Sequence, residues 1–260
     1  DADIELATGA ITMTAFGNAG QTCSACGRVY VEESIYEPFV ARLLDRVRTI
    51  KCGNPLDYTS SMGAITDPKS FEIFEKVIED AQSKGANIAL GGKRTKVNGR
   101  GDFFEPTVIT NATQYMIAVR YELFGPILPM VKVKNIDEAI KLANDSEYGL
   151  SAYVFSRDSQ KAKKIAEQIE SGNVIVNESF INNAIPDLPW GGEKQSGMGR
   201  IYTKEHLRQF CHAYHIHYDA LPFAVSQFFW APYSKDRYAR IKRYAQLFMR
   251  SGLLEKIRGF

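Results

Sequence analysis

Residues 128–177, which read LPMVKVKNIDEAIKLANDSEYGLSAYVFSRDSQKAKKIAEQIESGNVIVN, decide the fold class. Their apolar runs predict short strands at 128–134, 151–155 and 173–177. Apolar residues at helical spacing predict helices between them, at 136–144 and 159–171. Two successive strand–helix–strand units are typical of a parallel sheet covered by helices. We therefore expect an α/β protein with an open, mostly parallel, twisted sheet and helices on both faces.

The residues before this stretch continue the alternation. A helix at 3–16 runs into the small-residue turn Gly17–Gly20, a strand follows at 28–31, and Ser34 is placed to cap a helix that ends near Ile50. A second helix begins at Asp67-Pro68 and ends near Gly85. The next elements are a strand at 87–90 and a polar surface loop at 93–102. The residues after the decisive stretch predict a long ordered loop or lid at 178–200, and helical structure from 204 to 260 apart from the alternating residues 212–218.

Composition excludes several classes of protein. The chain has 260 residues, a net charge of +2 and no apolar run as long as a membrane span, so neither membrane insertion nor nucleic-acid binding is expected. The opening residues Asp1–Glu5 lack the basic and apolar regions of a signal peptide. Four irregularly spaced cysteines are too few for a disulfide scaffold. These features predict a globular protein of the reducing cytoplasm.

The chemistry is expected at Cys23, which lies in a small-residue turn between a helix and a strand. Such a turn can expose a thiol and direct backbone N–H groups toward an oxyanion, which favours a nucleophile. A buried, unreactive thiol is the first alternative. The second alternative is a redox or metal pair formed by Cys23 and Cys26, although Cys52 and Cys211 are too isolated to complete a zinc site.

Four segments resemble motifs of the aldehyde dehydrogenase superfamily, and they occur in the family's order and spacing. The segment that contains the thiol, FGNAGQTCSACGR, resembles the family's active-site cysteine segment. Cys26 departs from the glycine usual in the family, and Tyr121 from a glutamate. The four segments are Phe16–Arg28, Glu122–Pro126, Asn144–Leu150 and Pro189–Arg200.

The resemblance implies a role for several individual residues. Cys23 would attack an aldehyde carbonyl, hydride would pass to NAD or NADP, and water would hydrolyse the resulting thioester. Glu122 matches the residue that binds the nicotinamide ribose hydroxyls, and Phe124 matches the aromatic residue near the nicotinamide. Phe180 lies in the segment that matches the substrate entrance. The alternatives are a solvated surface carboxylate for Glu122 and ordinary packing for Phe124 and Phe180.

The resemblance also implies that this sequence is the C-terminal half of such an enzyme. The family's ELGGK segment, which supplies the general base, has no counterpart here, and neither Glu5 nor Glu32 matches it. We expect residues 1–200 to form the thiol-bearing catalytic domain and residues 201–260 an extension for oligomerisation and interdomain packing. One strand of that extension is expected near 213–218. The N-terminal dinucleotide-binding domain would be absent.

Two functions follow as expectations. The first is NAD(P)-dependent oxidation of an aldehyde to a carboxylic acid, completed by the missing half or a partner chain in a homo-oligomer and inactive in this fragment alone. The alternative is an inactive or split-gene fragment that folds and oligomerises without dehydrogenase activity. Residues 185–188 contain no arginine to bind an anionic substrate, which mildly favours neutral or apolar aldehydes.

Two further patterns receive structural interpretations. The histidines cluster between 206 and 217 without an acidic ligand set, so no metal site is expected. The basic residues of 235–258 alternate with apolar residues at helical spacing. This pattern is compatible with binding to a membrane or to nucleic acid, but it favours a helix that packs its apolar stripe and exposes a basic face.

Overall fold

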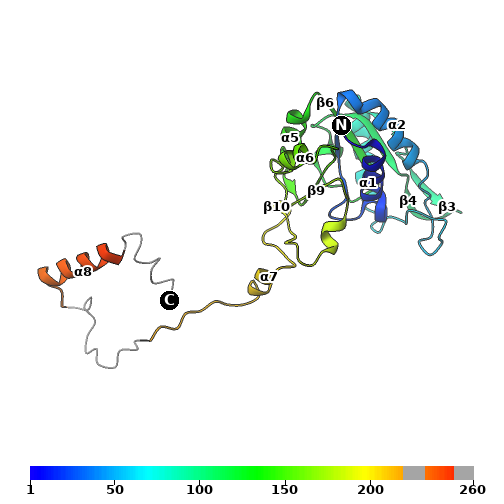
Figure 1. The fold of residues 1–260 in the computed structure, drawn as a ribbon. Coiled ribbons are helices and arrows are strands. Elements are labelled where there is room, and N and C mark those ends of the chain that lie inside the picture. Colours follow the sequence, from blue (N-terminus) through cyan, green and yellow to red (C-terminus); the bar gives the residue numbers. More distant parts are fainter. Residues whose placement is uncertain (219–231, 249–260) are drawn as a thin grey trace. The chain divides into compact units, whose positions relative to one another are not determined.

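The structure is a computed structural model that describes residues 1–218 and 232–248 (Figure 1). It divides into two compact units, Asp1–Cys211 and His212–Phe260, which are described separately. In the first unit the helices are α1 (Ile4–Phe16), α2 (Tyr36–Val47), α3 (Ser70–Ser83), α4 (Ile117–Arg120), α5 (Ile136–Asn144), α6 (Ser159–Ala166) and α7 (Lys204–Arg208), with short 3-10 turns η1 (Gly17–Gly20), η2 (Glu33–Ile35) and η3 (Ile181–Ala184). The strands are β1 (Val29–Glu32), β2 (Asn87–Leu90), β3 (Arg94–Val97), β4 (Arg100–Phe104), β5 (Thr107–Ala112), β6 (Ile127–Val133), β7 (Tyr148–Gly149), β8 (Ser151–Val154), β9 (Asn173–Val176) and β10 (Glu193–Lys194).

The main sheet has the strand order β1-β6-β5-β2, in which β1, β6 and β5 are parallel and β2 is antiparallel to β5. A second parallel pair is formed by β8 and β9, which are connected through α6. The chain is therefore α/β with a mostly parallel sheet, as expected. The decisive stretch departs from the expectation in one respect, because β6 and β8 belong to different ladders among the described strands.

The core of the first unit lies around the main sheet. Its largest fully buried side chains include Phe71 and Phe74 of α3 and Phe104 of β4. The Phe74 and Phe104 rings meet edge to face with centroids 5.1 Å apart, a favourable aromatic geometry. Residues 93–102 were expected to form a loop, which is wrong, because they contain β3 and most of the antiparallel partner β4. Their side chains are largely exposed, so the hairpin has little apolar alternation to reveal it.

Two helix ends also differ from the expectation. Ser34 does not cap α2, because residues 33–35 form a 3-10 turn and α2 begins at Tyr36 without a side-chain cap. Helix α6 ends at Ala166 rather than near Ser171. Strand β5 was not anticipated, although it lies in the centre of the sheet between β6 and β2.

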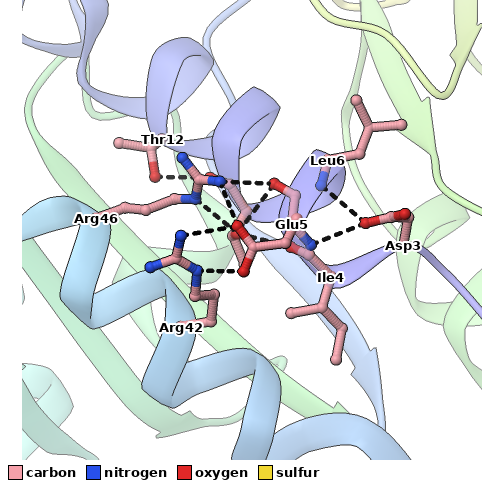
Figure 2. Close-up of polar contacts among 8 residues, drawn as sticks. Asp3, Ile4, Glu5, Leu6, Thr12, Arg42 and Arg46 are labelled. Atoms are coloured by element: carbon pink, nitrogen blue, oxygen red, sulfur yellow. Dashed lines mark hydrogen bonds and ion pairs between the residues drawn. The ribbon is translucent and has the colours of Figure 1, made fainter.

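Helix α1 is attached to α2, which lies beside it in Figure 1. Asp3 caps α1 by accepting hydrogen bonds from the N–H groups of Glu5 and Leu6. Figure 2 shows the Glu5 carboxylate between two guanidinium groups of α2, with Arg42 Nη2 at 2.7 Å and Arg46 Nη2 at 2.8 Å. The hydrogen bond from Arg42 holds the pKa of Glu5 below its usual range. This carboxylate is therefore a helix-to-helix tether.

The second unit contains α8 (Lys235–Phe248). Residues 212–218, which include the strand expected at 213–218, carry no regular secondary structure. The part of the expected basic helix beyond residue 248 lies outside the described residues. No helix among the described residues is both long and apolar enough to cross a membrane.

Candidate active site

The turn that precedes Cys23 is held in an unusual backbone conformation. After α1 ends, Asn18, Ala19 and Gly20 all have positive φ, at 52°, 56° and 71°. Left-handed conformation costs about 1–2 kcal/mol for a residue other than glycine. Asn18 Nδ2 donates to the Gln21 carbonyl at 2.9 Å, and Gln21 Nε2 donates to the Asn18 carbonyl at 3.1 Å. These reciprocal bonds stabilise a strained turn, a feature that clusters at functional sites.

Gln21 also connects the turn to a distant loop. Its Oε1 atom accepts a hydrogen bond from Thr66 N at 2.8 Å, and its Nε2 atom donates to the Ala64 carbonyl at 3.3 Å. The Gln21 side chain therefore holds the turn through hydrogen bonds both within the turn and to residues 64 and 66.

Cys23 itself is exposed, whereas the next residue, Ser24, is 2% exposed. The Ser24 carbonyl accepts a hydrogen bond from Tyr153 Oη at 2.7 Å. Among the described residues, none accepts a hydrogen bond from the backbone N–H of Cys23 or of Ser24. The turn thus presents an accessible thiol beside free backbone donors, the groups that stabilise an oxyanion.

The second cysteine of the turn has a different environment. Cys26 is enclosed, its Sγ donates to the Arg28 carbonyl at 3.5 Å, and burial raises its pKa to about 11. All four cysteines are free thiols, so no disulfide joins Cys23 to Cys26. The described residues contain no group of three potential metal ligands. The enclosed position and raised pKa of Cys26 favour a lone exposed nucleophile at Cys23 over a redox pair.

A close backbone contact joins the segment Glu122–Pro126, the second motif, to the turn that contains Cys23. A Cβ atom on Gly20 would lie 2.3 Å from the Gly125 carbonyl oxygen, so only glycine fits there. Gly125 in turn lies against the Phe74 ring, which a Cβ atom would approach to 2.2 Å. The segment that contains Glu122 and Phe124 is thereby fixed between the thiol turn and the core.

A cavity of about 540 Å³ brings three of the predicted site residues together. Cys23, Glu122 and Phe124 all line it. Phe180 does not line this cavity. Its ring packs over the end of α1, where Cε2 is 3.8 Å from the position of a Cβ on Gly17. The structure therefore assembles the thiol with the two residues that resemble cofactor-binding residues, and it places Phe180 outside that wall.

Glu122 and Phe124 both have features that suit ligand binding. The Glu122 carboxylate forms no hydrogen bond or ion pair with the described residues, and partial desolvation in the cavity wall raises its pKa although the side chain is exposed. Phe124 is 44% exposed and has φ of 49°, a left-handed conformation that is rare for an aromatic residue. An unpaired acceptor and an exposed aromatic ring thus face the same space as the thiol.

The segments Asn144–Leu150 and Pro189–Arg200, which are the third and fourth motifs, contact each other. Strand β10 of the glycine-rich motif pairs antiparallel with β7, and Lys194 Nζ donates to the Asn144 carbonyl at 2.6 Å. Ser196 Oγ accepts a hydrogen bond from Gly149 N at 2.9 Å. A Cβ on Gly172 would lie within 2 Å of the Gly191 carbonyl oxygen, which explains a small residue at this contact. The contacts between these two segments are structural. Gln195 and Ser196 of the second segment also line the cavity.

Sequence reasoning missed Tyr153, the residue that fixes the thiol turn through Ser24. Nothing in the apolar pattern of 151–155 distinguishes this tyrosine from a packing residue. The left-handed backbone at Asn18 and Ala19 was also missed, because only Gly17 and Gly20 signalled a turn.

Comparison with known proteins agrees with this geometry. The model of the aldehyde dehydrogenase family matches residues 1–216. Mitochondrial succinate-semialdehyde dehydrogenase of Oryza sativa subsp. japonica is 40% identical over 210 residues, which are 81% of this chain and 39% of that protein.

Solved structures give the same result. Betaine aldehyde dehydrogenase of Staphylococcus aureus in complex with NAD+ matches with a TM-score of 0.77 and 42% identity, covering 81% of this chain and 42% of that one. A 3,6-anhydro-L-galactose dehydrogenase in complex with NADP matches with a TM-score of 0.76 and 36% identity, covering 80% of this chain and 44% of that one. The chain thus spans about two fifths of the length of the relatives it matches.

Proposed function

Because the chain belongs to the aldehyde dehydrogenase family, we propose that it supplies the thiol-bearing half of an enzyme that oxidises an aldehyde to a carboxylic acid with NAD or NADP. The observation that carries the proposal is the single cavity lined by Cys23, Glu122 and Phe124. An exposed thiol suits the nucleophile of this reaction, and an unpaired carboxylate and an exposed aromatic ring suit part of its cofactor site.

Cys23 is the proposed nucleophile. Its thiolate adds to the aldehyde carbon, and the carbonyl oxygen becomes the oxyanion of a thiohemiacetal. The free N–H groups of Cys23 and Ser24 are available to stabilise that oxyanion. Loss of hydride from the thiohemiacetal gives a thioester, and hydrolysis of the thioester releases the carboxylic acid and restores the thiol.

Glu122 and Phe124 are the proposed contacts for the cofactor. The acceptor-only carboxylate of Glu122 suits a pair of ribose hydroxyl donors and has no competing partner among the described residues. Phe124 offers an exposed ring on the same wall. NAD or NADP, when bound, accepts the hydride. Phe180 keeps the proposed role of a residue near the substrate entrance.

The complete reaction needs groups beyond the matched region. Glu5 is tethered to Arg42 and Arg46, so it is a poor general base for water. We expect the base and most of the cofactor site from the missing half or a partner chain, and therefore no dehydrogenase turnover by this chain alone. Its relatives here are named for succinate semialdehyde, betaine aldehyde and 3,6-anhydro-L-galactose, which leaves the particular aldehyde open.

We also propose the division into a catalytic domain, residues 1–200, and an extension at 201–260 that mediates homo-oligomerisation. Tyr214, Ile216 and Tyr218 alternate in the sequence with His215 and His217, and they are 82%, 70% and 78% exposed. Alternating exposed apolar side chains suit a strand that pairs with another subunit. A cytoplasmic location remains a prediction from the cysteine content.

The alternative function is a fragment that folds and associates without dehydrogenase activity. The observation that favours it is the pairing of Glu5 with Arg42 and Arg46, which makes this acid a poor general base. Such a fragment would retain the thiol chemistry of Cys23 and lack reduction of the cofactor.

The first test separates the nucleophile from the rest of the reaction. p-Nitrophenyl acetate is added to the 260-residue chain, and release of p-nitrophenolate is measured together with the mass of each cysteine-containing peptide. We expect one acetyl group on Cys23, loss of the burst in Cys23→Ala, and an unchanged burst in Cys211→Ser, which removes another exposed thiol. Equal acetylation of Cys23 and Cys211 would contradict an activated nucleophile.

The second test addresses the complete reaction. Reduction of NAD and NADP is measured with an aldehyde panel, first with this chain alone and then after co-expression with the part of the rice relative that precedes its matched region. Turnover only in the co-expressed sample supports the proposed enzyme. Acetylation of Cys23 without turnover in either sample favours the inactive fragment.

A further inference from the structure

Helix α8 lies outside the part of the chain that the match to the aldehyde dehydrogenase family explains. The family model matches residues 1–216, whereas α8 spans Lys235–Phe248 and is drawn in orange in Figure 1. The candidate site residues all belong to the first unit, and the strand proposed for subunit pairing ends at Tyr218. Neither the proposed reaction nor the proposed oligomer therefore accounts for the sequence of this helix.

The helix carries an apolar stripe along one side. Tyr238, Ile241 and Ala245 follow one another at positions i, i+3 and i+7, so they share one face of the helix. Tyr244, three residues after Ile241, widens this stripe. The Tyr238 side chain is 67% exposed and that of Tyr244 is 50% exposed. The sequence pattern favours a packed stripe, whereas at least half of each of these two aromatic side chains is open to solvent.

Basic side chains border the stripe on both sides. Lys235 and Lys242 lie three residues before and four residues after Tyr238, along one border. Arg240 lies four residues before Tyr244, along the other border. Among the described residues, none of these three cations forms an ion pair. The helix is therefore an apolar stripe between two rows of positive charge.

An apolar stripe between cations matches the interface of an anionic membrane. Lipid headgroups carry the complementary negative charge, and the region just below them accepts apolar and tyrosine side chains. The long stems of lysine and arginine let their charges reach the headgroups while the stripe lies deeper. A nucleic acid would pair with the cations but would leave the apolar stripe in water. The charges and the apolar surface together favour a membrane.

We propose that α8 binds the surface of an anionic phospholipid membrane. The helix lies along the interface, with its apolar stripe below the headgroups and the bordering cations against the lipid phosphates. It has 14 residues, which are too few to span a bilayer, so it binds the surface and does not cross it. The binding is independent of the proposed thiol chemistry, because it uses no residue of the candidate site.

Co-sedimentation with vesicles tests the proposal directly. The 260-residue chain is mixed with vesicles of phosphatidylcholine alone, or of equal parts phosphatidylcholine and phosphatidylserine. We expect its affinity for the anionic vesicles to be at least about tenfold higher than for the neutral ones. Added salt should weaken this binding, because it screens the cations. The anionic vesicles should also slow amide hydrogen exchange within residues 235–248.

A matched pair of variants separates burial of the stripe from simple attraction of charge. Ile241→Lys places a cation within the stripe, and Ala239→Lys places the same charge on the opposite side of the helix. Lysine is a good helix former, so neither variant disfavours the helix itself. The affinity of Ile241→Lys for anionic vesicles should fall at least about tenfold, and Ala239→Lys should bind at least as tightly as the parent. Slow amide exchange in β6 reports an intact main sheet in both variants.

Several outcomes would overturn the proposal. Equal binding to neutral and anionic vesicles, or binding to neither, is the first. Undiminished vesicle binding by Ile241→Lys is the second, because attraction of charge alone would then explain the binding.

Further measurements assign α8 another role if the vesicles fail to bind. Binding of polyuridylate RNA to the parent and both variants alike would assign the cations to nucleic acid. A lower urea midpoint of Ile241→Lys than of Ala239→Lys would mean that the stripe packs within the chain. A lower molecular mass of Ile241→Lys in solution would mean that the stripe pairs with a second copy. Each of these results contradicts a membrane-bound helix.

Discussion

Gly20 and Gly125 touch backbone to backbone, so closely that a single methyl group on Gly20 would lie 2.3 Å from the Gly125 carbonyl oxygen. About a hundred residues separate them in the sequence, and each stands within a segment that lines the cavity. This contact fixes the distance between the thiol turn and the segment of Glu122 and Phe124. The geometry of the candidate site therefore depends on a position that carries no functional group.

Gly20→Ala should damage both stability and thiol reactivity. The substitution places a Cβ against a backbone carbonyl and requires φ of 71°, so we expect a loss of at least about 2 kcal/mol in the free energy of unfolding. Because the turn is displaced, the rate at which Cys23 is acetylated should fall by at least about tenfold. Urea unfolding and p-nitrophenyl acetate kinetics measure the two effects.

Gly63→Ala is the matched control for that substitution. A Cβ on Gly63 meets no atom within 4 Å, and its φ is not positive. Gly63→Ala should change neither the free energy of unfolding nor the rate of Cys23 acetylation appreciably. Equal effects of Gly20→Ala and Gly63→Ala would show that the close contact has no special importance.

The sequence predicted what is local and missed what depends on contacts between distant residues. Helix α5 was predicted with its bounds, because Asn135 caps it and its apolar stripe is regular. The Cys23 turn and the ELFGP segment were recognised by motif.

The errors have a common physical cause. Residues 93–102, which contain β3 and the start of β4, are largely polar and exposed, so burial gives this part of the hairpin little sequence signal. The importance of Tyr153 depends on the fold that brings it to Ser24, a residue far earlier in the chain. In both cases the decisive partner is distant in sequence.

Tyr153→Phe should loosen the thiol turn without removing the ring. The Ser24 carbonyl, which belongs to a nearly fully buried residue, would lose its hydrogen bond from the phenol at 2.7 Å. A cost of about 0.5–1.5 kcal/mol is expected, with slower acetylation of Cys23. Tyr115→Phe, at a tyrosine that is 81% exposed, is the control and should leave both measurements unchanged. A Tyr153→Phe variant as stable and reactive as the parent would show that the bond does not position the turn.

Cys26 should resist alkylation until strongly alkaline pH. The thiolate is the reactive form, and burial raises the pKa of Cys26 to about 11. Its labelling by iodoacetamide should therefore increase about tenfold for each pH unit from neutrality toward that value. At neutral pH the exposed Cys23 should be labelled much faster than Cys26. Peptide mass mapping across pH measures both sites. Comparable labelling of Cys23 and Cys26 at neutral pH would contradict the enclosed environment of Cys26.

The ion pairs of Glu5 between α1 and α2 should make the stability of the folded protein depend on pH in the acid range. Its hydrogen bond from Arg42 lowers the folded-state pKa, so the folded protein binds this proton less readily than the unfolded chain. The stabilisation is complete above the ordinary glutamate pKa and is lost as the pH falls through the lowered folded-state value. Glu5→Gln should therefore be less stable than the parent at neutral pH, and the difference should shrink in acid. Thermal unfolding at several pH values measures it, and Glu75→Gln, at an exposed glutamate of α3 without an ion pair among the described residues, should show no such trend. A difference between Glu5→Gln and the parent that stays constant into acid would assign the effect to packing instead of to the paired charge.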